Sequence, residues 1–235
     1  MNVTSFLTRT SYALRGTDED VPTFGDDEAV YWLDLLNRKK DELYQNVTQN
    51  WRNTYEVRSI GTISASTAPA YNLPTDFLAL SGDENSTDGA GGGVYIIKTD
   101  GNRVDVDVIR PEERDSVNRA AYVAGSAPEK LYFTTAIVAG EDIIGGTLYA
   151  PGYYLPADLT LADDVLPFLD PNWACMAVAA EVAFNDITYE DKAADLNSKA
   201  NSLFEQMVRK NRGNLHNAPR RVKWNVKRIR SPKVN

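Results

Sequence analysis

Apolar residues recur at helical spacing near both ends of the chain and at strand spacing in the middle. Within residues 3–15, Phe6, Leu7 and Leu14 lie among polar residues, and Gly16 follows directly. This pattern predicts a short helix that ends at the glycine, because glycine readily adopts the left-handed conformation that closes many helices.

The second predicted helix is longer. Asp26 or Asp27 can cap its start, and Glu28 lies in the first turn, where the helix dipole favours an anion. Apolar spacings of three, four and seven predict about 25 helical residues with one buried stripe, formed by Leu33, Leu36, Leu43, Val47 and Trp51. We expect the charged residues of this helix to face solvent, namely Arg38, Lys39, Lys40 and Glu42.

The middle of the chain is typical of antiparallel strands. Short stretches rich in Val, Ile, Thr and Tyr are separated by Gly, Pro, Asn and Asp. The clearest hairpin is YIIKT-DGN-RVDVDVI, because Asp100 and Gly101 suit the positive φ angles of a tight turn.

Helical spacing returns in the last third. Asp170 is a natural cap and Pro171 suits the first helical position. The residues that follow are apolar almost all round, which predicts a buried helix. The next segment, YEDKAADLNSKANSLFEQMVRKNR, carries one stripe whose small residues permit close helix packing, formed by Ala193, Leu196, Ala200, Leu203 and Met207.

This order of elements predicts an α+β fold. We expect a helical bundle formed by the N- and C-terminal helices, an inserted antiparallel β region, and an extended basic C-terminal tail. Residues 1–53 and 161–213 would supply the bundle, residues 54–160 the β-rich domain, and residues 214–235 the arm.

Charge is distributed unequally along the chain. Residues 1–208 hold 15 basic and 33 acidic residues, a formal charge of −18, whereas the last 27 residues hold ten basic and no acidic ones. Nucleic acid would be repelled by the body but attracted by the tail. No apolar run approaches the ~20 residues of a membrane span and the start lacks the order of a signal peptide, so we expect a cytoplasmic product without membrane contact.

The sequence offers little catalytic chemistry. His216 is the single histidine, outside every predicted element, and Cys175 lies in an apolar helix, so a nucleophilic triad and a zinc site are not expected. Asp105 and Asp107 share one face of a predicted strand, which we interpret as a solvent face.

The loop DENSTDGAGGG matches neither a calcium-binding loop nor a phosphate-binding loop. Asp83, Asn85 and Thr87 have calcium-loop spacing, but Asp88 replaces the glycine at the sixth position and Val94 the glutamate at the twelfth. The glycines at 89–93 lack the Lys-Ser/Thr of a phosphate-binding loop. We therefore predict no catalytic residue, metal site or cofactor, and treat this loop as a possible contact surface or an idle one.

Three stretches have a recognisable order of residues. They are FLTRTSYALRGTDEDVPTFGDDEAVYWLDLLNRKKDELY at the start, AYNLPTDFLAL at residues 70–80, and residues 152–207, which return from the β region into the C-terminal helices. Together they resemble the head-to-tail connector (adaptor) proteins of tailed bacteriophages. The resemblance implies a structural virion protein that forms a ring, usually twelvefold, between the portal and a tail or nozzle protein at the head–tail junction. It also implies a DNA channel through the ring, without specific DNA binding, and a C-terminal segment that reaches the portal.

The tail has a regular order of residues in addition to its positive charge. In RRVKWNVKRI, apolar residues alternate with polar ones at strand period, which suits addition to the edge of a partner's sheet. We therefore favour docking on an acidic protein surface, most readily the portal, over a solvated arm or a DNA-binding arm in which Trp224 stacks on a base. The predicted contact residues are Arg220, Arg221, Val222, Lys223, Trp224, Val226, Lys227, Arg228 and Arg230.

Two alternatives stay open. A tail-side completion or nozzle-type protein would share the need for ring symmetry and two interfaces. A carbohydrate-active enzyme or nuclease would use carboxylates such as Asp105 and Asp107.

Overall fold

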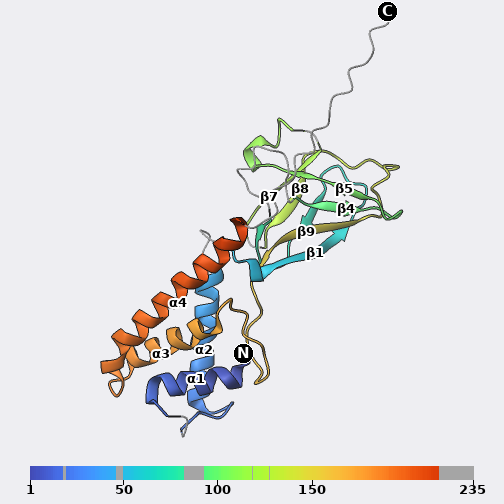
Figure 1. Ribbon diagram of the computed structural model, residues 1–235. Helices are drawn as coiled ribbons and strands as arrows, with labels where there is room; N and C mark the ends of the chain where they lie inside the picture. The colour runs from blue at the N-terminus through green and yellow to red at the C-terminus, as the bar shows by residue number, and fades with distance from the viewer. Residues whose placement is uncertain (18–19, 46–49, 82–92, 118, 127, 217–235) are drawn as a thin grey trace, which may run out of the picture.

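The computed structural model describes residues 1–216 except 18–19, 46–49, 82–92, 118 and 127. Figure 1 shows the helices gathered at one end of the molecule and the β-sheets at the other. The described residues form four α-helices and two sheets in which antiparallel pairing prevails. The predicted α+β class is confirmed.

Helix α1 (Val3–Arg15) ends as predicted. The Asn2 side chain accepts a hydrogen bond from the Ser5 backbone N–H at its start, and Gly16 has a φ of 78° at its end. Both ends are therefore fixed by residues within four positions along the chain, as helix caps require.

Helix α2 (Asp27–Tyr44) is shorter than predicted. It has 18 residues and its C-cap is Gln45. Trp51 lies outside it and precedes the short 3₁₀ helix η1 (Arg52–Thr54), yet the indole is buried and its Nε1–H donates to the Leu43 carbonyl at 3.2 Å. Trp51 continues the apolar spacing because it folds back onto the end of α2; Val47 is outside the described residues.

The predicted solvent face of α2 is wrong at Lys40, which is fully buried. Its Nζ lies 2.5 Å from Asp158 Oδ1, so a partner distant in sequence compensates the buried charge. Arg38 and Glu42 are exposed as predicted, and Lys39 is partly buried. Arg38 and Lys39 both pair with Glu181 of the next helix, α3 (Pro171–Asn185). The buried face also differs from the predicted stripe, because Leu33 is only partly buried. It consists of Ala29, Trp32, Leu35, Leu36, Lys40, Leu43 and Tyr44.

Helices α3 and α4 (Glu190–His216) begin and pack largely as expected. The Asp170 carboxylate accepts from the Asn172 N–H, with Pro171 at the first helical position. On α4, Leu196, Ala200 and Met207 are buried. The prediction that α3 is buried all round is wrong at Phe184, which is 80% exposed.

One buried cluster joins all four helices. It contains residues of α1, α2, α3 and α4 together with Leu159, Leu166 and Phe168 from the segment between β9 (Thr147–Tyr154) and α3. Phe168 stacks on Tyr44 with centroids 6.1 Å apart. The segment that leaves the sheets is thus part of the helical core.

The first sheet has the order β1-β9-β4-β5, and β3 pairs with β9 as well. The additional strands are β1 (Tyr55–Thr62), β3 (Phe77–Leu80), β4 (Tyr95–Ile97) and β5 (Arg103–Asp105). All of its pairs are antiparallel.

The second sheet has the order β2-β8-β7-β6. Its strands are β2 (Ala70–Asn72), β6 (Asp107–Val108), β7 (Ala120–Ala124) and β8 (Lys130–Phe133), and a 3₁₀ helix η2 (Pro111–Glu113) lies between β6 and β7. Only its β6–β7 pair is parallel. Ile96 and Leu148 of the first sheet share a second buried cluster with Ala121 and Leu131 of this one. The two sheets therefore form a sandwich.

The predicted hairpin is present as β4 and β5. Gly101 has a φ of 84°, and the Gly101 N–H donates to the Lys98 carbonyl at 2.9 Å. The strand after the turn does not continue as predicted, because the chain crosses to the other sheet at Val106. Asp105 and Asp107 therefore belong to different sheets.

Candidate functional site

The predicted C-terminal arm begins where α4 ends. α4 continues to His216, so residues 214–216, assigned to the arm, are helical, and His216 does not lie outside every element. The last turns of α4 adjoin η1, because Asn211 Nδ2 donates to the Asn50 carbonyl at 2.8 Å and its Oδ1 accepts from the Arg52 N–H at 3.1 Å. All nine predicted contact residues, from Arg220 to Arg230, lie outside the described residues.

Cys175 is an inert part of the helical core. It is fully buried, and burial raises the pKa of its thiol to about 11. Since the thiolate is the nucleophilic form, this thiol is protonated at neutral pH and shielded from reagents.

The two acidic candidates, Asp105 and Asp107, are both exposed as predicted but belong to different sheets. Asp105 is exposed and pairs with Arg103 of the same strand at 2.6 Å, whereas Asp107 lies in the second sheet. Among the described residues, no group of three or more His, Cys, Asp or Glu side chains could hold a metal ion. The loop predicted as a possible contact, residues 83–93, lies almost entirely outside the described part of the chain.

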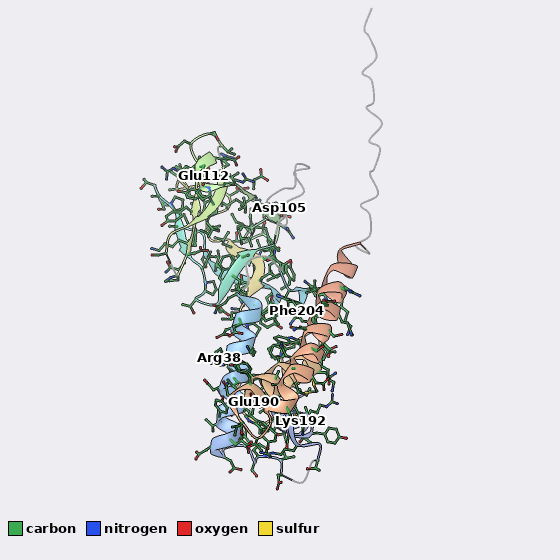
Figure 2. All side chains as sticks on the ribbon, turned by 90° about the vertical axis from the view of Figure 1, so that its left-hand side faces the viewer. Arg38, Asp105, Glu112, Glu190, Lys192 and Phe204 are labelled. Atoms are coloured by element: carbon green, nitrogen blue, oxygen red, sulfur yellow. The ribbon has the colours of Figure 1, made fainter. Side chains whose placement is uncertain are left out.

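The helical end farthest from the sheets brings three segments together. Arg15 at the end of α1 pairs with Glu28 at the start of α2 at 2.5 Å, and its Nε donates to the Tyr189 hydroxyl at 3.3 Å. Lys192 of α4 donates to the Leu14 carbonyl at 2.6 Å. Figure 2 shows Glu190 and Lys192 at this end and Phe204 near the sheets.

These three segments expose apolar side chains. Phe184 is 80% exposed and Ile187 is 88% exposed, in and after the last turn of α3. The end of α1, the loop after it and the start of α2 expose four more apolar side chains. Groups of exposed apolar residues mark interaction sites, whereas single ones are ordinary. We use the name distal helical surface for the exposed apolar residues of these segments, which are Tyr12, Phe24, Val30, Tyr31, Phe184 and Ile187.

Sequence reasoning missed this surface. Phe184 continues the apolar run of α3, so its spacing predicts burial. Ile187 offered a signal, because it lies between two predicted helices and thus on no helical stripe.

Comparisons with known proteins identify the family to which this chain belongs. Within the described residues, no helix has the length and apolar character needed to cross a membrane. A search of curated proteins gives no match. The profile of the family described as SU10 adaptor protein matches residues 1–227. Because this match extends over nearly the whole chain, the protein belongs to the SU10 adaptor family, a family of phage head–tail adaptors.

Proposed function

We propose that this protein forms a ring, expected to be twelvefold, that joins the portal to a tail or nozzle protein around a DNA channel. The observation that carries the proposal is the family match over residues 1–227, which includes the body and the first part of the arm. In this proposal residues 1–53 and 161–216 form one body, residues 54–160 an inserted domain, and residues 217–235 an arm.

The two proposed axial contacts begin at opposite ends of α4. The distal helical surface includes Ile187, just before α4, and the arm starts after His216. A helix of 27 residues is about 40 Å long at 1.5 Å per residue. A rigid element of this length separates two partners, which is what a connector between two other rings requires.

The arm suits an acidic protein partner. Its apolar residues alternate with basic ones, so one face can pair with a sheet edge while the other neutralises acids. We assign this contact to the portal and the distal helical surface to the tail side.

The acidic body suits a DNA channel. Residues 1–208 carry a formal charge of −18, and DNA binds proteins mainly through cations that displace its counterions. A wall of net negative charge lets DNA slide past instead of holding it.

The test is the mass of the full chain alone and with portal-bearing capsids. We expect a monomer alone and a ring on the portal. A chain that ends at His216 should keep its thermal unfolding profile but lose portal attachment. Trp224→Ala should weaken attachment more than the neighbouring Lys223→Ala. Equal attachment of the truncated and full chains would refute the role of the arm.

The tail-side alternative gives the opposite result. A completion or nozzle-type protein would bind isolated tails without the portal, and its ring would form there. The carboxylate-enzyme alternative would need Asp105 and Asp107 to act together, whereas Asp105 is already paired with Arg103 at 2.6 Å.

A further inference from the structure

Each sheet of the sandwich carries a stacked pair of tyrosines outside the buried core. Tyr95 of β4 lies opposite Tyr149 of β9, with ring centroids 5.2 Å apart and planes at 15°. Tyr122 of β7 lies opposite Tyr132 of β8, with centroids 5.4 Å apart and planes at 15°. None of these four residues belongs to the cluster that joins the sheets.

The first pair is part of a broader aromatic surface. Leu148 and Ala150 are buried, so Tyr149 between them points away from the core. Tyr55 and Val57 of β1 are each 46% exposed.

Charged side chains also lie beside the Tyr95–Tyr149 pair. The Arg103 guanidinium lies 3.9 Å from the Tyr95 ring centroid, and Asp105 lies directly opposite Tyr95 in the register. We call this surface the Tyr95–Tyr149 face; it comprises Tyr55, Val57, Tyr95, Arg103, Asp105 and Tyr149.

The second pair has a neighbour of positive charge. Leu131 of β8 is buried, so Lys130 and Tyr132 on either side of it point outward. Lys130 is exposed and makes no ion pair with any described residue. We call this surface the Tyr122–Tyr132 face; it comprises Tyr122, Lys130 and Tyr132.

Outward positions of a sandwich are usually polar, and tyrosine and arginine are the residues most enriched where proteins meet. The two faces lie on opposite sides of the sandwich, because each sheet turns its other side to the shared core. A partner at one end of the molecule could not cover both. A second copy of the chain could, because every copy presents one face of each kind.

We propose that the Tyr95–Tyr149 face of one copy packs against the Tyr122–Tyr132 face of the next. A contact between unlike faces adds each subunit in the same rotational sense, and it closes into a ring when the rotations sum to a full turn, as the proposed ring requires. Charge supports this occupant at one position, because Asp105 is 72% exposed and its contact with Arg103 uses only the Oδ1 atom, which leaves Oδ2 for Lys130 of the next copy. The inference rests on the proposed ring and adds that the sandwiches form its lateral contact.

Cross-linking of paired cysteines tests the arrangement. The full chain with Asp105→Cys and Lys130→Cys together is assembled on portal-bearing capsids and treated with a bis-maleimide. Buried Cys175 provides little background reaction. We expect a ladder of covalent multimers from the double variant and only monomers from either single variant, because unlike faces never bring two identical residues together.

The other outcomes distinguish a wrong lateral contact from the absence of a ring. Dimers from a single variant would show a contact between like faces and overturn the inference. A ring detected by mass without a ladder would overturn the inference while leaving the proposed function intact. If no ring forms on the portal, both fail.

Charge reversal adds an independent measurement. Lys130→Glu or Asp105→Lys alone should weaken assembly about tenfold, and the two together should restore it, because opposite charges then face each other again. Tyr122→Ser should weaken assembly while Leu161→Ser, at a residue that is 63% exposed and lies outside the proposed contacts, should not. Thermal unfolding of each variant verifies the fold. Equal effects of the two serine substitutions, or a double charge variant no better than the singles, would contradict the proposal.

Discussion

The buried ammonium of Lys40 allows a quantitative test of how the helices hold the segment that comes from the sheets. Its side chain is 1% exposed, with Nζ 2.5 Å from Asp158 Oδ1 and 3.3 Å from Asp41 Oδ1. The residue after Asp158 is held as well, because the Asn37 amide accepts from the Leu159 N–H at 2.9 Å and donates to its carbonyl at 3.1 Å. We expect removal of Asp158 to lower the free energy of unfolding more than removal of Lys40.

This difference arises because the two carboxylates are partly exposed whereas the Lys40 ammonium is buried. Asp158 and Asp41 are 66% and 40% exposed, so both carboxylates keep water contact through their exposed oxygens when Lys40 is lost, and only Asp41 Oδ1 is left buried. Lys40→Met should therefore lower the free energy of unfolding by only about 1 kcal/mol. Asp158→Ala leaves the buried ammonium with Asp41 alone and should cost about 2–3 kcal/mol. The double variant should resemble Lys40→Met, which gives a coupling energy of about 2 kcal/mol.

Urea unfolding followed by far-UV circular dichroism measures all four proteins of this cycle. Lys39→Met is the matched control, because Glu181 keeps its contact with Arg38 when Lys39 is removed. We expect the control to change stability by less than about 1 kcal/mol. Additive effects of the two substitutions, or a larger loss from Lys40→Met than from Asp158→Ala, would refute the reasoning.

Three further predictions follow from burial and exposure. Phe184→Ser combined with Ile187→Ser should change the unfolding free energy by less than about 0.5 kcal/mol per site, because both are exposed, yet reduce tail binding to ring-bearing capsids; unchanged binding in a pull-down would contradict the role of the distal helical surface. Cys175 should react with a thiol reagent only after unfolding, since burial raises its pKa to about 11; rapid labelling of the native protein would contradict this. Burial raises the pKa of Tyr44 and of Tyr154 to about 12. Each neutral tyrosine contributes fully to the free energy of unfolding below pH 10, and this contribution falls by up to about 2 kcal/mol as the pH rises from 10 to 12. Urea midpoints that stay constant across this range would refute the prediction.

Features controlled by neighbouring residues were predictable from the sequence. The start of α3 at Asp170, the end of α1 at Gly16 and the β4–β5 turn at Gly101 all depend on caps or turns that operate within a few residues. The buried stripe of α4 was predictable as well, because helical period alone determines which side chains share a face.

Features controlled by distant residues were not predictable. The sequence pattern predicts that Lys40 is a surface residue, because its compensating partner, Asp158, is 118 positions away. The end of α2 was obscured because Trp51 returns to the helical core after the helix has stopped. Strand alternation placed Asp105 and Asp107 together, but alternation does not reveal that the chain changes sheets between them. The distal helical surface depends on three segments that meet only in the folded chain.

The proposed contacts belong to separate elements, and this separation makes the proposals distinguishable. The arm follows α4, the distal helical surface lies at the other end of that helix, and the tyrosine faces belong to the sandwich. A substitution in one element leaves the cores of the others intact, since the helical and sandwich clusters share no buried residue. Loss of the arm should therefore prevent attachment to the portal, and loss of the distal surface should leave a portal-bound ring without a tail. Loss of a tyrosine face should leave subunits that reach the portal one at a time, because only lateral contacts convert separate attachments into a closed ring.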